Sequence, residues 1–211
     1  MTKDEVKKLR MNSPESLQFL NNATKFYNLM MMYRCAIREI QTKLEVLDDE
    51  FSVENNRNPI SFIKTRIKKP NSIYDKLQKM GYEFTTENIQ TYLNDVAGVR
   101  IVCAFIDDIY MISDLITQQD DIKVIEIKER DYISSPKPNG YRSYHVIVGV
   151  PVYCLDGMEY FPVEIQFRTM SMDFWASMEH RISYKKERAD KEQLKDELRE
   201  YANMLVEIEG R

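Results

Sequence analysis

The sequence predicts a mixed α/β fold of the α+β kind, with a sheet between helical ends. Apolar residues recur every three or four positions between residues 30 and 51 and again between 194 and 208, as expected for amphipathic helices. Four short runs rich in β-branched residues lie between them and read as strands. Helices and strands therefore share the central part of the chain.

Length and composition favour one soluble globular domain. The chain has 211 residues, of which 43% are hydrophobic and 30% charged, so one core with helical appendages is expected over residues 1–211. No apolar run approaches the roughly 20 residues of a membrane span, and the first residues lack the apolar segment of a signal peptide. We expect a cytoplasmic protein whose three scattered cysteines are reduced and structural.

The first long helix is expected over about residues 14–51. Ser13 followed by Pro14 is a helix-start signal. The apolar stripe that follows consists of Tyr33, Ile37, Ile40, Leu44, Leu47 and Phe51. Such a stripe packs on a core or forms a subunit interface; we favour packing, with part of the stripe shared between subunits.

A short helix is predicted to follow Pro70, which breaks the preceding pattern. Ser72 is the expected cap, Ile73 and Leu77 supply the buried side, and Gly81 ends the helix. Residues 66–69 lead into this helix as an extended segment.

The remaining elements alternate between strands and helices. Strands are expected at residues 99–105, 123–129, 143–152 and 160–169, with a helix at 107–118 capped by Asp107 or Asp108. A helix is then predicted over residues 169–187, and a last amphipathic helix over about 190–209.

Two acids are candidates for chemistry. In the strand at 160–169 the two-residue period places Glu164, Gln166 and Arg168 on the face opposite Val163. A polar face suits either a solvated edge strand or a functional central strand. Asp95 precedes another strand, beside Gly98, and is either a turn-capping residue or the second ligand of a divalent cation such as magnesium.

A basic cluster surrounds these acids in the sequence. On the short helix, Ser72, Lys76 and Lys79 share one face. No glycine-rich P-loop is present, so side chains would have to hold a triphosphate. The cluster comprises Arg66, Lys68, Lys69, Lys76, Lys79 and Arg100.

A turn in "PKPNGYRSYH" leads into the strand at 143–152. Asn139 and Gly140 are turn formers, so Tyr141 projects near the strand end, where its ring could stack on a base. Lys137 and Arg142 could meet anions. His145 is either a hydrogen-bonded core residue or part of a site.

The motifs "RIKKPNS…K", "DVAGVRIVCAF", "RDYI…PKPNGYRSYH", "VEIQFRT" and "MDFWASMEH", in this order, resemble the synthetase domain of the RelA/SpoT family over about residues 58–184. The length resembles that of its stand-alone members, the small alarmone synthetases. "PKPNGYRS" and "MDFWAS" resemble the RelP-like branch more than the RelQ-like one.

The resemblance implies a nucleotidyltransferase-like sheet and transfer of pyrophosphate from ATP to the 3′-hydroxyl of GTP or GDP, with Mg²⁺ as cofactor. It implies that Asp95 and Glu164 bind the metal and that Glu164 activates the hydroxyl. Tyr141 would stack on guanine. The ATP site would contain Arg66, Lys68, Ser72, Lys76, Lys79 and Arg100, and the GTP/GDP site Tyr141, His145, Gln166, Lys137, Arg130 and Asp173.

Two other classes of function agree less well with the sequence. Another nucleotidyltransferase-fold enzyme would be expected to carry Gly-Ser followed by Asp-x-Asp, which does not occur in the sequence. A noncatalytic nucleotide-sensing or RNA-binding module would be favoured if the two acids were replaced. The net charge of −4 argues against a nonspecific nucleic-acid coat.

The resemblance also bears on hydrolysis and assembly. The family's hydrolase activity uses a His-Asp metal site, and the chain has two histidines and no His-Asp pair, so we expect synthesis without hydrolysis. The terminal helices suggest a homo-oligomer, and similar small alarmone synthetases form tetramers. No membrane association is expected, and the sequence gives no indication of RNA binding.

Overall fold

A computed structural model describes residues 14–126, 131–155, 157–184 and 191–209. Its centre is a five-stranded sheet in the order β1-β2-β5-β4-β3. The strands are β1 (Ile60–Ile67), β2 (Ala97–Cys103), β3 (Lys123–Glu126), β4 (Tyr144–Cys154) and β5 (Gly157–Thr169). Strands β2 and β5 pair in parallel, and the other neighbours pair antiparallel. The sheet is therefore mixed, as the sequence predicts.

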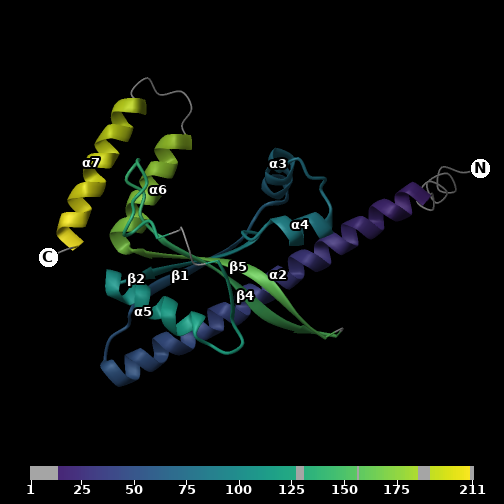
Figure 1. Cartoon of the computed structure of the whole chain (residues 1–211), viewed down its shortest axis with the longest axis horizontal. Helices are drawn as coiled ribbons and strands as arrows, with labels where there is room; N and C mark the ends of the chain where they lie inside the picture. Colours follow the sequence, from purple (N-terminus) through teal and green to yellow (C-terminus); the bar gives the residue numbers. More distant parts are fainter. Residues whose placement is uncertain (1–13, 127–130, 156, 185–190, 210–211) are drawn as a thin grey trace, which may run out of the picture.

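Helices cover one face of the sheet and flank the other. They are α2 (Pro14–Asn55), α3 (Pro70–Met80), α4 (Thr86–Tyr92), α5 (Ile106–Thr117), α6 (Met170–Tyr184) and α7 (Lys191–Glu209). Helices α2 and α5 pack on one face, while α3 with α4 and the α6–α7 pair stand at opposite ends of the other (Figure 1). The backbone of the second face therefore lies between these two groups of helices (Figure 1).

The core lies between α2 and the covered face. Tyr33, Ile40 and Leu44 from the predicted stripe are fully buried, and they join Val163 and Phe167 of β5 in one apolar cluster. Burying these side chains is what fixes a single long helix across the sheet. Packing of the stripe on the core is therefore confirmed, and the sharing of part of it between subunits stays a prediction.

The segment before α3 is extended as expected, and its residues up to Ile67 belong to edge strand β1. The expected helix caps, in contrast, are wrong. Ser72 is not the cap of α3, because Pro70 occupies the first turn and Lys69 is the N-cap residue. Neither Asp107 nor Asp108 is the N-cap of α5: Phe105 is, and its N–H donates to the Asp108 carboxylate at 3.2 Å. Gly81 does end α3, in the left-handed conformation.

Other features agree with the sequence or extend it. Cys35, Cys103 and Cys154 are free thiols. The strand predicted at 123–129 is described only as far as Glu126, and Arg130 lies outside the described residues. Helix α4, which was not predicted, begins after Thr85, whose side chain accepts the N–H of Asn88. None of the helices in the described ranges has the length and hydropathy of a membrane-spanning segment.

Candidate active site

The polar face predicted for β5 lies on the central strand of the sheet. Glu164 and Arg168 are only 7% and 5% exposed, and Gln166 lies between them on the same face. The alternative of a solvated edge strand is therefore wrong. Buried charges are costly unless neighbouring groups compensate them, so the surroundings of these residues define the candidate site.

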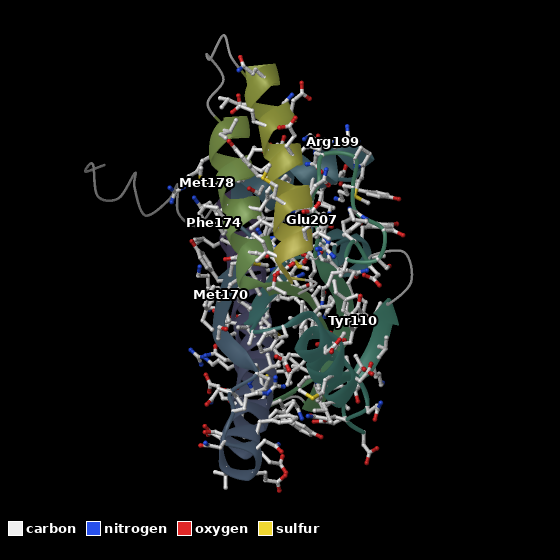
Figure 2. The ribbon with its side chains drawn as sticks, turned by 90° about the vertical axis from the view of Figure 1, so that its left-hand side faces the viewer. Tyr110, Met170, Phe174, Met178, Arg199 and Glu207 are labelled. Atoms are coloured by element: carbon white, nitrogen blue, oxygen red, sulfur yellow. The ribbon has the colours of Figure 1, made fainter. Side chains whose placement is uncertain are left out.

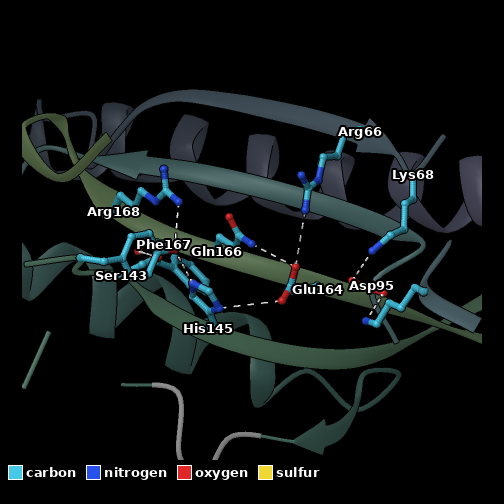
Figure 3. Close-up of polar contacts among 11 residues, drawn as sticks. Arg66, Lys68, Asp95, Ser143, His145, Glu164, Gln166, Phe167 and Arg168 are labelled. Carbon is cyan, nitrogen blue, oxygen red and sulfur yellow. Dashed lines mark hydrogen bonds and ion pairs between the residues drawn. The ribbon is translucent and has the colours of Figure 1, made fainter. Parts of the chain in front are cut away.

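Arg66, Gly98 and Glu164 form one row across β1, β2 and β5. The Arg66 side chain crosses over Gly98, and Nη2 reaches to 3.9 Å from Oε2 of Glu164. A Cβ at position 98 would lie 3.2 Å from Nε and 3.3 Å from Cγ of Arg66. Figure 3 shows Arg66 directed at Glu164, and the absence of a side chain at Gly98 opens the path for this approach.

The next row contains Lys64, Arg100, Gln166 and His145. The amide of Gln166 donates to Oε2 of Glu164 at 3.0 Å, and Nδ1 of His145 lies 3.8 Å from Oε1. Glu164 is thus approached by a guanidinium from one side and an imidazole from the other. A cavity of about 220 Å³ lies along this part of the face, lined by residues of both rows from β1, β2 and β5.

Asp95 is held by two lysines at the start of β2. Nζ of Lys68 donates to Oδ2 at 2.6 Å, and Nζ of Lys76 on α3 lies 2.9 Å from Oδ1. Burial alone would raise the pKa of Asp95, but the hydrogen bonds and charges of the two lysines outweigh it and hold the pKa below its usual value. The acid predicted as a possible turn cap is therefore an ionised carboxylate in a cationic setting.

Asp95 and Glu164 carry the oxygen ligands that a hard divalent cation prefers. A carboxylate oxygen has two lone-pair sites, so Oδ1 of Asp95, which is buried and lies 2.9 Å from Nζ of Lys76, keeps one for a cation. Within the described residues, no three His, Cys, Asp or Glu side chains gather as a metal site. A cation held by Asp95 and Glu164 would therefore take its other ligands from a substrate or from water, which is the usual situation of Mg²⁺ at phosphates.

Tyr141 lies at the other end of the face in a network of polar contacts. Its hydroxyl lies 2.9 Å from Nε2 of His145 and accepts from Nη2 of Arg168 at 2.9 Å. Tyr132 meets the rings of Tyr141 and His145 edge-on. Nζ of Lys137 lies 5.0 Å from the centre of the Tyr141 ring, within the range of a cation–π contact.

Asp173, in the first turn of α6, connects the two parts of this face. Its Oδ1 accepts hydrogen bonds from Arg168 at 3.0 Å and from Arg100 at 3.2 Å. Its Oδ2 lies 3.8 Å from Nζ of Lys64. Burial and the neighbouring positive charge of Arg168 lower the pKa of Arg100. Asp173 thus contacts Arg168, which in turn donates to the hydroxyl of Tyr141.

The structure brings together most of the predicted site residues. Two exceptions are Ser72 and Lys79, which are exposed on α3 outside these contacts. Lys64 and Tyr132 belong to the cluster but were not predicted. The two-residue spacing of Lys64 with Arg66 was a usable signal, whereas the position of Tyr132 depends on a loop that the sequence pattern does not define.

Comparison with known proteins gives one consistent family. Residues 65–189 match the model of the region found in RelA/SpoT proteins. The chain is 42% identical over 177 residues to GTP pyrophosphokinase YwaC of Bacillus subtilis, covering 84% of this chain and 83% of that one.

Solved structures of two B. subtilis proteins resemble the fold. Small alarmone synthetase 2 matches with a TM-score of 0.76 and 39% identity, over 88% of this chain and 94% of that one. Small alarmone synthetase 1 bound to its product pppGpp matches with a TM-score of 0.77 and 32% identity, over 88% and 93%. By its sequence motifs, fold and these matches, the chain belongs to the RelA/SpoT family.

Proposed function

We propose that the protein is a GTP pyrophosphokinase that moves the β,γ-pyrophosphoryl group of ATP to the 3′-hydroxyl of GTP or GDP, forming pppGpp or ppGpp and AMP. The observation that carries the proposal is the position of Glu164, buried on the central strand between a cationic region at Arg66 and an aromatic region at Tyr141. The family and the names of the relatives support it.

The donor half would lie around Asp95. Arg66, Lys68, Lys76 and Arg100 would hold the ATP phosphates, because charged side chains must do what a P-loop does elsewhere. The predicted contributions of Ser72 and Lys79 belong to this half as well. Asp95 and Glu164 would bind Mg²⁺, which when bound neutralises charge on the phosphate oxygens.

The acceptor half would lie around Tyr141, whose ring would stack on guanine. Glu164 would take the proton of the 3′-hydroxyl, the bond from O3′ to the β-phosphorus would form, and the bond from that phosphorus to the bridging oxygen of AMP would break. The other acceptor residues would be His145, Gln166, Lys137, Arg130 and Asp173.

The test is nucleotide chromatography after mixing the protein with labelled ATP, Mg²⁺ and GTP or GDP. Wild type is expected to form pppGpp or ppGpp with AMP. Glu164→Gln should bind both nucleotides in calorimetry and lose about 10² to 10⁴ in rate, the usual contribution of a positioned base. The matched control is Glu159→Gln, an exposed acid on the same strand. Product formation by Glu164→Gln at the control's rate would reject the proposed role of Glu164, and no product from wild type would reject the reaction.

We also propose that the whole chain is one synthetase domain that acts in the cytoplasm and forms a homotetramer. An apolar groove of about 430 Å³ runs between α6 and α7, and Figure 2 shows Met170, Phe174 and Met178 along the outer side of α6. Phe174 is 64% exposed, and a second copy of the chain would cover such a surface. Phe174→Glu should lower the mass measured by light scattering; an unchanged mass would reject this interface.

A further inference from the structure

We infer that helix α7 positions the acceptor turn, defined as residues 137–142, and thereby sets the affinity for the guanine nucleotide. Arg142 and Glu209 act as positioning residues in this inference. It rests on the proposed function insofar as Tyr141 is taken to bind guanine. The turn and α7 meet at two separate points, one on either side of Tyr141.

The first contact is at Gly140. Its φ of +91° is a conformation that favours glycine, and its N–H donates to the carbonyl of Lys137 at 2.8 Å. A Cβ at this position would lie 2.8 Å from Cβ of Ala202 and 3.7 Å from Cα of Arg199. The backbone of the turn therefore lies directly against α7.

The second contact is an ion pair. Nη1 of Arg142 lies 3.4 Å from Oε2 of Glu209, and the two side chains are only 12% and 15% exposed. The other carboxylate oxygen of Glu209 accepts from the hydroxyls of Thr169 and Ser171. Because Thr169 ends the strand that carries Glu164, the last turn of α7 connects the acceptor turn to the central strand.

These contacts touch only one half of the candidate site. Tyr141 lies in the chain between Gly140 and Arg142, so its ring is placed by both contacts. The residues around Asp95 lie on β1, α3 and the start of β2, and the side chains that contact Asp95 are Lys68 and Lys76, whereas α7 packs on α6. Loosening α7 should therefore weaken binding of the guanine nucleotide and leave binding of ATP largely unchanged.

The experiment determines KM for GTP and KM for ATP separately in three variants: Arg142→Met, Glu209→Gln and the double variant. We expect each single change to raise KM for GTP about fivefold or more, the usual size of such a coupling, with KM for ATP within about twofold. The double variant should be no worse than the more affected single variant, because both changes break the same pair. Arg142→Lys should restore part of the loss.

The control is Glu207→Gln, an exposed acid two residues from Glu209 on α7 (Figure 2). Circular dichroism establishes that each variant is folded. Equal changes in the two KM values, independent effects in the double variant, or values like the control's would overturn the inference.

Two further readouts separate this inference from the proposed reaction. Calorimetry with GTP alone requires no turnover, so wild type that binds GTP and forms no pppGpp contradicts only the reaction. Trp175, the only tryptophan, donates from Nε1 to the Leu198 carbonyl at 2.6 Å and lies beside Gly140. Its emission should shift to the red in Arg142→Met and Glu209→Gln but not in Glu207→Gln; unchanged emission in all three would also overturn the inference.

Discussion

Replacing Gly98 tests whether Arg66 must cross the sheet to reach Glu164. In Gly98→Ala the new Cβ would lie 3.2 Å from Nε and 3.3 Å from Cγ of Arg66, against the roughly 3.5 to 4.0 Å of a comfortable contact. The arginine must shift by a few tenths of an ångström. In Gly98→Val the added methyl groups stand in its path, so the guanidinium must leave its position 3.9 Å from Glu164.

The expected loss follows from what Arg66 is proposed to do. Removing one donor that stabilises developing charge costs about 10² to 10³ in rate. Displacing Arg66 with valine should approach that range, and the smaller shift caused by alanine should cost about tenfold. Valine has a high strand propensity and glycine a low one, so Gly98→Val should fold at least as stably as wild type. Activity and stability would thus change in opposite directions.

The assay combines nucleotide chromatography with thermal unfolding. The matched control is Gly149→Ala on β4, where a Cβ would meet its neighbours at 3.5 Å or more, an ordinary contact, and activity should be kept. In an Arg66→Met background, Gly98→Val should cost little more, because the arginine is already gone. Wild-type turnover in Gly98→Val, together with a loss in Arg66→Met, would refute the reasoning.

Four other outcomes are expected. Tyr141→Ala should weaken GTP binding in calorimetry by about ten- to a hundredfold, since stacking on a base contributes roughly 1 to 3 kcal/mol; unchanged affinity would contradict it. Although burial would raise the pKa of Asp131, hydrogen bonds from Ser134, Ile133 and Tyr110 lower it overall. This stabilisation is complete above the unfolded pKa of about 3.9 and is lost as pH falls through the folded value. The melting temperatures of wild type and Asp131→Asn should therefore converge as the pH is lowered from about 6 towards 2 or 3, and a constant difference would be evidence against this account. Burial raises the pKa of the Cys103 thiol to about 12, so a thiol reagent should modify exposed Cys154 in the native protein and Cys103 only after unfolding; rapid modification of Cys103 would argue against its burial. Incubation with ppGpp and Mn²⁺ should release no pyrophosphate, and its release would show a hydrolase activity.

The sequence predicts well what local periodicity determines. The long apolar stripe of α2 and the strands around Val163 and Val148 depend on patterns within one segment, and they occur close to the expected positions. Strand β1 was missed because it is defined by pairing with β2, whose partner residues lie 30 to 43 positions further along the chain. Helix α4 has only seven residues, too few for two turns of a repeating pattern.

The candidate site also combines features that one segment determines with features that depend on tertiary contacts. The shared face of Glu164, Gln166 and Arg168 follows from the period of one strand. In contrast, the approach of Arg66 over Gly98 depends on the register of two strand pairs, and no single segment contains it. Arg142 was expected only to meet an anion, and its partner Glu209 could not be foreseen because it lies 67 positions further along the chain. Contacts of this range are set by tertiary packing.

The edge position of β1 has a consequence for solubility. An open edge strand presents unpaired backbone groups that can pair with another chain, and proteins commonly guard such edges with lysine and other charges. β1 lies at one end of the sheet order and carries Lys64 and Arg66. Arg66, which is proposed to hold ATP, and its neighbour Lys64 thus also discourage edge-to-edge aggregation. Neutralising both side chains would remove the charges that protect the edge as well as a contact to the nucleotide. Loss of activity in such a variant must therefore be separated from loss of soluble protein.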